Sequence, residues 1–387
     1  TQIMGYGTLM YAYAILLPRM AEDLGLSLSS AFGVLSLALF FGGLASPLAG
    51  NLVDRFGGRW VMTCGSIVAC FGLMSLSMVQ GPVSLFLGIL VAEAAGMFVL
   101  YNVAFASVTR LVLKVSARTS ISIITLFGGI ASTIYWPLTL ALLTSYGWQV
   151  TWVLLGVSYL LVATPVHFFI LRRPISDARQ HSEPDRTLGP ELTGTARQQG
   201  LLWMIISFVF SGYIMGAVMT LWVTNVQDLG HTAAIAALAG AVIGPFKTVG
   251  RFFEMLVSTT MHPLTTYLLS LGLMLSGFIV LLTIGFTVPG VICAAALYGM
   301  GDGIKTIARG TLPLALFGRK NYGARLGWIS FFLIGANASA PFAFASLTQA
   351  FGGWWSFAAM AFLLVLASIA YLWIPDPRKL NSDDDVT

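Results

Sequence analysis

Charged residues are scarce in this sequence of 387 residues: Asp, Glu, Lys and Arg together make up 9%, whereas a soluble chain carries about a quarter. Hydrophobic residues reach 57%, and the mean hydropathy is +0.86. This composition excludes a water-soluble protein. Because one membrane-spanning helix needs roughly 20 apolar residues, the chain has enough of them for about ten to twelve such helices.

Two further absences narrow the functional classes. The three cysteines, Cys64, Cys70 and Cys293, fall inside apolar runs, without the positions of a disulfide framework or the spacing of a zinc site, so we interpret them as packing residues. The sequence also lacks a phosphate-binding Gly-rich loop, the paired histidines of a metalloprotease and a Gly-x-Ser-x-Gly elbow. We therefore expect that the protein is not an enzyme, binds no metal or other cofactor and does not use ATP directly.

Apolar stretches of helical length divide the chain into two halves of six. They lie near 2–19, 28–50, 58–79, 83–109, 119–143 and 149–171, and then near 200–225, 233–258, 264–285, 289–317, 326–347 and 354–375. The polar segment 172–199 is typical of a linker, and 376–387 of a tail. The sequence thus predicts an all-α membrane protein with twelve transmembrane helices, in bundles at 1–171 and 200–375. Because Thr1 already lies in an apolar run, we expect the natural chain to begin upstream.

The distribution of Lys and Arg predicts the orientation, because positive residues near helix ends stay in the cytoplasm. One set of connections contains only Arg19. The opposite set, with the linker and the tail, contains Arg55, Arg59, Arg110, Lys114, Arg118, Arg172, Arg173, Arg179, Arg186, Arg197, Arg319, Lys320, Arg325, Arg378 and Lys379. Both termini and the linker are therefore expected in the cytoplasm. The net charge of +5 reflects this topology, and we expect no nucleic-acid partner.

The turn between the second and third predicted helices, residues 50–60, combines an acid, two arginines and three glycines. At a helix end, Asp54 can pair with a neighbouring arginine or accept hydrogen bonds from the start of another helix, and such bonds can open and close between conformations. The alternative is an ordinary turn whose arginines obey the positive-inside rule.

Gly50, Asp54, Arg55, Gly57 and Arg59 resemble the G-x-x-x-D-R-x-G-x-R signature of the major facilitator superfamily, at the same place between helices two and three. Gly58 stands where that family commonly has a basic residue. The resemblance implies two six-helix bundles around a central cavity, alternating between inward-open and outward-open states. It also implies that Asp54, Arg55 and Arg59 help to close the cytoplasmic side.

Six charged residues of the second half are expected at membrane depth. Lys247, Arg251 and Glu254 share one face of the eighth predicted helix, and one face of the tenth carries Asp302, Lys305 and Arg309. Such groups cost several kcal/mol unless they are paired or face water, which makes them candidate functional residues. Four cations against two anions leave a positive surplus that would attract an anion. The alternative, which applies most to the shallower Glu254 and Arg309, is mutual neutralisation as buried pairs.

The stretch GRFFEMLVSTT, residues 250–260, is similar to the eighth helix of the monocarboxylate porter family. In that family, an arginine followed five and six positions later by Leu and Val binds the substrate carboxylate, and the resemblance implies this role for Arg251 alone. Lys247 stands where many members have an acid, and the first helix offers Tyr6, Tyr11 and Tyr13 in place of that family's lysine.

Glu93 is the embedded acid of the first half, in the fourth predicted helix. An acid in low-dielectric surroundings is a candidate proton carrier. The alternative is a structural glutamate that is hydrogen-bonded to neighbouring helices. Tyr101 and Asn102, two turns further on, can hydrogen-bond a substrate or simply pack.

From these features we expect a monomeric secondary active transporter in a bacterial inner membrane, moving a small organic anion, in the first place a carboxylate, by alternating access. Protons or a counter-anion would supply the energy. The expected substrate-binding residues are Lys247, Arg251, Lys305, Tyr11, Tyr101 and Asn102. The residues expected to couple protons or complete charge pairs are Asp302, Glu254, Glu93 and Arg309. The alternatives are a proton-coupled exporter of amphipathic drugs or organic cations, with Glu93 binding the cargo, and a transporter-like receptor.

Overall fold

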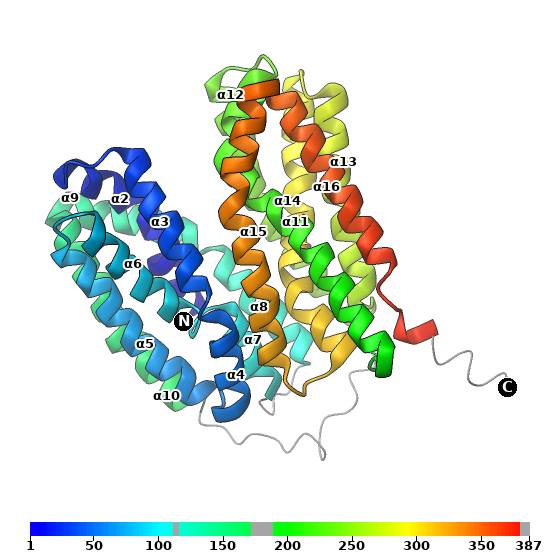
Figure 1. Ribbon diagram of the computed structural model, residues 1–387, viewed down its shortest axis with the longest axis horizontal. Coiled ribbons are helices and arrows are strands. Elements are labelled where there is room, and N and C mark those ends of the chain that lie inside the picture. The colour runs from blue at the N-terminus through cyan, green and yellow to red at the C-terminus, as the bar shows by residue number, and fades with distance from the viewer. Residues whose placement is uncertain (111–115, 172–188, 380–387) are drawn as a thin grey trace. The chain divides into compact units, whose positions relative to one another are not determined.

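The computed structural model describes residues 1–110, 116–171 and 189–379, and every regular element within these ranges is a helix (Figure 1). The elements up to residue 170 are α1 (Gln2–Tyr6), η1 (Gly7–Tyr11), α2 (Ala12–Asp23), α3 (Leu28–Gly43), α4 (Ser46–Phe56), α5 (Gly58–Ser75), η2 (Leu76–Met78), α6 (Pro82–Gly96), α7 (Tyr101–Arg110), α8 (Ala117–Gly129), α9 (Ala131–Ser158), η3 (Tyr159–Ala163) and α10 (Thr164–Ile170). The later elements are α11 (Gly194–Asp228), α12 (Ala233–Val257), α13 (Pro263–Ile284), α14 (Val288–Phe317), α15 (Tyr322–Phe351) and α16 (Gly353–Leu372). The predicted all-α class is confirmed.

Ten helical segments of the described chain are long and apolar enough to cross a membrane. One of them, 117–170, has 54 residues. At about 1.5 Å per residue it is more than twice as long as the ~30 Å hydrocarbon core is thick. Gly147 interrupts it with φ 77° and ψ 169°, a conformation that favours glycine, so this segment accounts for two passes. Together with the helical stretch 2–23, the described passes number twelve.

Several passes are broken within the membrane-spanning stretch. The second pass is interrupted between α3 and α4, where Pro47 occupies the first turn of the new helix and has no N–H to continue the old one. The fourth, predicted as one helix over 83–109, divides into α6 and α7, with backbone bonds tightened to Phe98 N–Ala95 O and Val99 N–Gly96 O at the break. Broken helices of this kind are common near transporter binding sites.

The ends of the remaining helices agree with the sequence prediction to within a few residues, except at the linker. Helix α11 begins at Gly194, so the last residues of the predicted linker 172–199 are helical. Arg197, Gln198 and Gln199 are good helix formers, which explains this extension. Residues 172–188 of the linker, residues 380–387 of the tail, and Lys114 lie outside the described residues.

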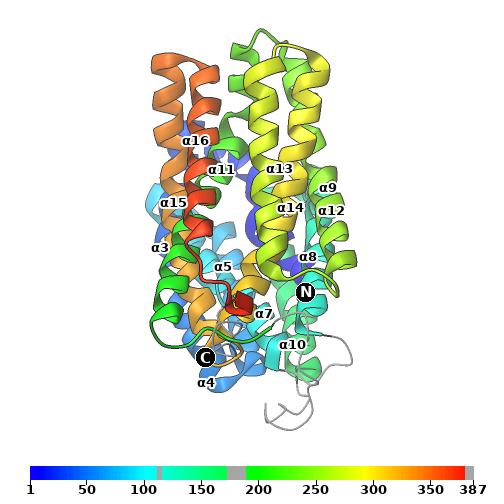
Figure 2. The same ribbon diagram turned by 90° about the vertical axis from the view of Figure 1, so that its right-hand side faces the viewer.

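The chain forms two compact units. Unit 1 contains 1–120, 124–182 and 321–334, and unit 2 contains 121–123, 183–320 and 335–387. In unit 1, α3 and α5 both pack against α6 (Figure 1). In unit 2, α12 and α13 pack against α14, and α11 packs against α16 (Figure 2). The sequence-based division into bundles at 1–171 and 200–375 stays a prediction.

The cysteines are all free, but only Cys70 is buried. Cys64 and Cys293 are exposed on α5 and α14, so the interpretation as packing residues does not hold for these two. The reason is that a membrane helix can direct an apolar side chain outward, toward lipid, which an apolar sequence run does not reveal.

Candidate functional site

The three glycines of residues 50–60 are required either by the backbone conformation or by close packing. Gly57 has φ 77°, which L side chains rarely adopt, and it reverses the chain direction. Gly50 permits close packing, because a Cβ there would lie 2.2 Å from the carbonyl oxygen of Gly323. At Gly58, a Cβ would lie 1.9 Å from Ser107 Oγ. This serine explains why the position is glycine here.

Asp54 caps the start of α15. Its Oδ1 accepts a hydrogen bond from the N–H of Gly323 at 3.0 Å, and its Oδ2 accepts one from the N–H of Ala324 at 2.7 Å. These N–H groups belong to the first turn, where no intrahelical acceptor exists, and the positive end of the helix dipole favours a carboxylate. The hydrogen bonds expected between Asp54 and another helix are therefore present.

The arginines around this turn have different contacts. Arg110, at the end of α7, donates from Nη1 to the carbonyl oxygens of Val53 and Asp54, each at 2.6 Å, and so satisfies the end of α4. The guanidinium of Arg55 lies 5.1 Å from the ring centre of Phe56. That of Arg59 lies 5.0 Å from Trp60 and 4.1 Å from Phe168. The two signature arginines thus stack on aromatic rings, and Arg110, whose sequence signal was only topological, binds the backbone at Asp54.

In unit 2, Asp302 lies between two lysines. Its Oδ2 is 2.6 Å from Nζ of Lys247 on α12, and its Oδ1 is 2.8 Å from Nζ of Lys305 on α14. The Asp302 side chain is fully buried, whereas the side chain of Lys247 is 15% exposed. Lys305 also donates to the carbonyl oxygen of Ser211 on α11 at 2.9 Å. The ion-paired alternative thus holds for both lysines, but this triad of Lys247, Asp302 and Lys305 retains one net positive charge.

Glycines bring the backbones of α12 and α14 close enough to form the triad. A Cβ on Gly303 would lie 2.2 Å from the carbonyl oxygen of Lys247, and a Cβ on Gly299 2.6 Å from that of Ile243. From the other helix, a Cβ on Gly250 would lie 2.2 Å from the carbonyl oxygen of Met300. Such small-residue contacts are typical of tightly packed membrane helices. The register they fix places Lys247 opposite Asp302.

The remaining charges of α12 and α14 continue the same helix faces. Arg251 is 8% exposed and Glu254 is fully buried. Glu254 Oε2 accepts a hydrogen bond from Ser122 of α8 at 2.7 Å. Arg309 lies one turn beyond Lys305, and its buried Nε has no hydrogen-bond partner in the described chain. The six embedded charges predicted from the sequence thus all belong to unit 2, on two helices in contact.

Glu93 of α6 forms a separate polar cluster in unit 1. Its side chain is buried, and the hydroxyl of Tyr13 on α2 faces its carboxylate, with Tyr159 of η3 nearby. Within the described residues, Glu93 Oε1 and both tyrosine hydroxyls are buried without a geometrically good hydrogen bond. The Glu93 carboxyl and the two hydroxyls beside it thus lack hydrogen bonds that buried polar groups normally make. From the sequence, Tyr13 was noted only as one of the polar groups of the first helix, and Tyr159 was not singled out, since a buried hydroxyl gives no periodic signal of its own.

The other predicted polar residues of unit 1 lie in different surroundings. Tyr11 packs edge-on against Trp136 at 5.8 Å between ring centres. Tyr101 is buried, donates to the carbonyl oxygen of Thr125 at 3.3 Å, and stacks on Phe105. Asn102 Nδ2 donates to Ser330 Oγ at 2.6 Å, while its Oδ1 has no partner among the described residues. The hydroxyl and the ring of Tyr101 thus both have contacts within unit 1, and Asn102 keeps one unused acceptor.

No group of three or more His, Cys, Asp or Glu side chains in the described ranges could hold a metal ion. The charged clusters instead combine cations with isolated acids on candidate membrane spans, where ionisable side chains are candidate functional residues.

Comparison with known families explains the layout. The model of the Major Facilitator Superfamily matches residues 2–308, most of the chain. The chain belongs to the major facilitator superfamily. It is therefore a membrane transporter rather than an enzyme, as the sequence predicted. Curated protein sequences give no significant match.

Solved structures agree with this assignment. The chain is similar to the human organic anion transporter MFSD10 (TETRAN), with a TM-score of 0.72, 16% identity and coverage of 96% of this chain and 97% of that one. It is also similar to the superfamily transporter FucP in the outward conformation, with a TM-score of 0.74, 14% identity and 97% of each chain covered. At these identities the likeness concerns the fold, and the twelve-helix major facilitator fold is confirmed.

Proposed function

We propose that this transporter carries a small organic anion by alternating access, and that this anion is a carboxylate. The observation that supports it is the charge balance of α12 and α14, where four cations and two acids lie on helix faces in direct contact. Even with Asp302 shared by two lysines, a positive surplus remains at membrane depth. An anionic substrate would compensate that surplus in the loaded state.

Arg251 is the residue proposed to bind the carboxylate. It lies one turn from Lys247, on the same face of α12. A guanidinium offers two parallel N–H donors to a carboxylate, which the ammonium of a lysine cannot do. Lys247, as the more exposed lysine of the triad, would strengthen the attraction, and Lys305 would hold Asp302 in place. That one solved structure with this fold belongs to an organic anion transporter is compatible with the proposal.

Coupling is proposed to use either protons or a counter-anion. Glu93, with its unsatisfied Oε1, is the proton-carrying candidate, while the triad and Arg309 suit anion exchange. Asp54, Arg55, Gly57 and Arg59 would act in closing the cytoplasmic side, since the bonds of Asp54 to the start of α15 can break and re-form. We further propose a monomer in a bacterial inner membrane with both termini cytoplasmic.

The test is uptake of short-chain monocarboxylates into proteoliposomes by wild type, Arg251→Lys and Arg251→Gln. One charged hydrogen bond is worth about 1.5–3 kcal/mol, so we expect KM to rise about tenfold or more in Arg251→Gln. Arg251→Lys should recover only part of the loss because it keeps charge without the fork. Arg19→Gln is the matched control, since Arg19 is exposed and pairs with Glu22 and Asp23. Unchanged uptake in Arg251→Gln would refute the assignment.

A second candidate is a proton-coupled exporter of amphipathic drugs or organic cations. It is favoured by the pairing of both lysines with Asp302 and by the burial of Glu93 beside Tyr13 and Tyr159, because an acid beside aromatic rings suits a cationic cargo. Thermal unfolding of the purified protein with carboxylates or with lipophilic cations separates the two proposals. A true ligand raises the unfolding temperature by mass action, and the other class leaves it unchanged.

A further inference from the structure

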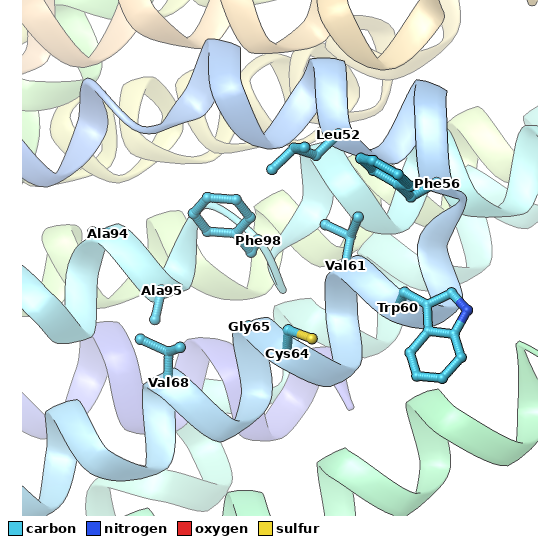
Figure 3. A pocket seen from close by; sticks show the side chains of 10 residues that line it. All are labelled: Leu52, Phe56, Trp60, Val61, Cys64, Gly65, Val68, Ala94, Ala95 and Phe98. Carbon is cyan, nitrogen blue, oxygen red and sulfur yellow. The ribbon is translucent and has the colours of Figure 1, made fainter.

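An apolar groove lies on the surface of unit 1 between α4, α5 and α6, beside the turn that carries Arg55 and Arg59. Its volume is about 320 Å³, and its lining is entirely apolar (Figure 3): Leu52, Phe56, Trp60, Val61, Cys64, Gly65, Val68, Ala94, Ala95 and Phe98. Small residues of α5 and α6, such as Gly65 and Ala95, form its floor, while Phe56, Trp60 and Val68 are exposed along its sides. All three contributing segments are candidate membrane spans. An apolar groove whose sides are exposed on membrane-spanning segments is suited to contact with lipid tails.

The groove extends over most of the thickness of one leaflet. From Trp60 to Val68 it follows nine residues of α5, whose eight steps span about 12 Å at 1.5 Å per residue. One leaflet contributes about half of the ~30 Å hydrocarbon core. An acyl chain that starts beside Trp60 would therefore run along the groove through most of the leaflet.

Two arginines stand at the end of the groove where the membrane span ends. Arg55 and Arg59 flank Gly57, the turn that joins α4 to α5. Their guanidinium groups lie 5.1 Å and 5.0 Å from the ring centres of Phe56 and Trp60, both of which line the groove. The carboxylate of the neighbouring Asp54 is directed at the backbone of Gly323 and Ala324. The charge beside the groove is thus positive, at the depth of lipid headgroups.

We propose that this groove binds one anionic diacyl phospholipid, with an acyl chain against α5 and α6 and the headgroup phosphate on Arg55 and Arg59. Arginine is suited to this position because its planar fork holds phosphate oxygens while its face stays on an aromatic ring. The site depends on the membrane location of the chain and not on the substrate that it carries.

The first test is native mass spectrometry of the purified transporter titrated with dioleoylphosphatidylglycerol or dioleoylphosphatidylcholine. We expect one phosphatidylglycerol to bind more tightly than phosphatidylcholine, and each of Arg55→Gln and Arg59→Gln to weaken it about fivefold. Arg19→Gln should have no effect. Equal binding of the two lipids, or competition by soluble glycerol phosphate as strong as by the lipid, would overturn the proposal.

The groove itself is tested by filling it. Cys64→Phe should abolish the tight binding, whereas Cys293→Phe, at the other exposed cysteine, should leave it intact. If Cys64→Phe does not fold, Ala94→Leu fills the same groove from α6. Retention of the lipid by a folded filling variant contradicts the proposal.

Labelling of the unmodified chain provides an independent measurement with an internal control. In phosphatidylglycerol nanodiscs, a membrane-permeant maleimide should modify Cys64 several-fold more slowly than in phosphatidylcholine nanodiscs, while Cys293 reacts equally in both. Equal rates at Cys64 would overturn the assignment.

Discussion

Lys247 of α12 and Asp302 of α14 form an ion pair of 2.6 Å in which the carboxylate is completely buried. The same carboxylate also binds Lys305 at 2.8 Å. Removing one partner of a buried pair leaves a charge without compensation, which costs more than the pair itself contributes. Asp302 is therefore the residue on which both lysines depend.

Asp302→Asn should be among the most destabilising single changes in unit 2, by about 3–5 kcal/mol, because two ammonium groups then lie together without an acid. The double variant Asp302→Asn/Lys247→Met should regain part of this loss, since it removes one of the two excess charges. Thermal unfolding of the detergent-solubilised protein measures both effects. Additive losses in the double variant would show that the two side chains are not energetically coupled.

Gly303→Ala should weaken the contact between α12 and α14, because the new Cβ would lie 2.2 Å from the carbonyl oxygen of Lys247. Overpacking of this kind typically costs about 1–3 kcal/mol. Gly244→Ala is the matched control, since Gly244 is an exposed glycine of α12 and a Cβ added there would meet no atom within 4 Å. Gly303→Ala should unfold at a clearly lower temperature than Gly244→Ala. Equal unfolding temperatures would contradict a role of Gly303 in the close packing of α12 and α14.

The sequence predicted much of this architecture because its two strongest signals, apolar runs and embedded charges, are local. Helix α12 was predicted over 233–258 and extends over Ala233–Val257. That Lys247, Arg251 and Glu254 share a face follows from helical periodicity alone.

Contacts between distant segments had no such signal. Asp54 and its partner Gly323 are 269 positions apart. Nothing in either segment specifies the other, because the pairing depends on the close approach that Gly50 permits. For the same reason, the meeting of Lys247 with Asp302 depends on the register of two helices and could not be predicted from their separate patterns. The break in the fourth pass likewise has no proline to announce it, whereas the break in the second pass has a local signal in Pro47.

Asp54→Ala should destabilise the start of α15, since two N–H groups of its first turn lose their acceptors. Loss of such a cap costs about 0.5–2 kcal/mol. Asp54→Asn should cost less, because the amide oxygen can still accept one bond, although the favourable interaction of a negative charge with the helix dipole is lost. Hydrogen exchange of the amides at 323 and 324 provides the readout. Protection unchanged in Asp54→Ala would contradict the capping role.

Glu93→Gln should abolish the stimulation of uptake by a proton gradient while leaving substrate counterflow active. Glutamine has nearly the same shape and can still approach Tyr13, but it cannot take up or release a proton. The measurement compares uptake into proteoliposomes with and without an imposed pH difference, and counterflow at equal pH. Glu22→Gln, at an exposed acid that pairs with Arg19, is the matched control and should keep the stimulation. If Glu93→Gln still responds to the gradient, Glu93 is structural and the coupling belongs to the charges of α12 and α14. If both uptake and counterflow fail in a protein that unfolds at the wild-type temperature, Glu93 acts on the cargo itself, as the cation-exporter proposal requires.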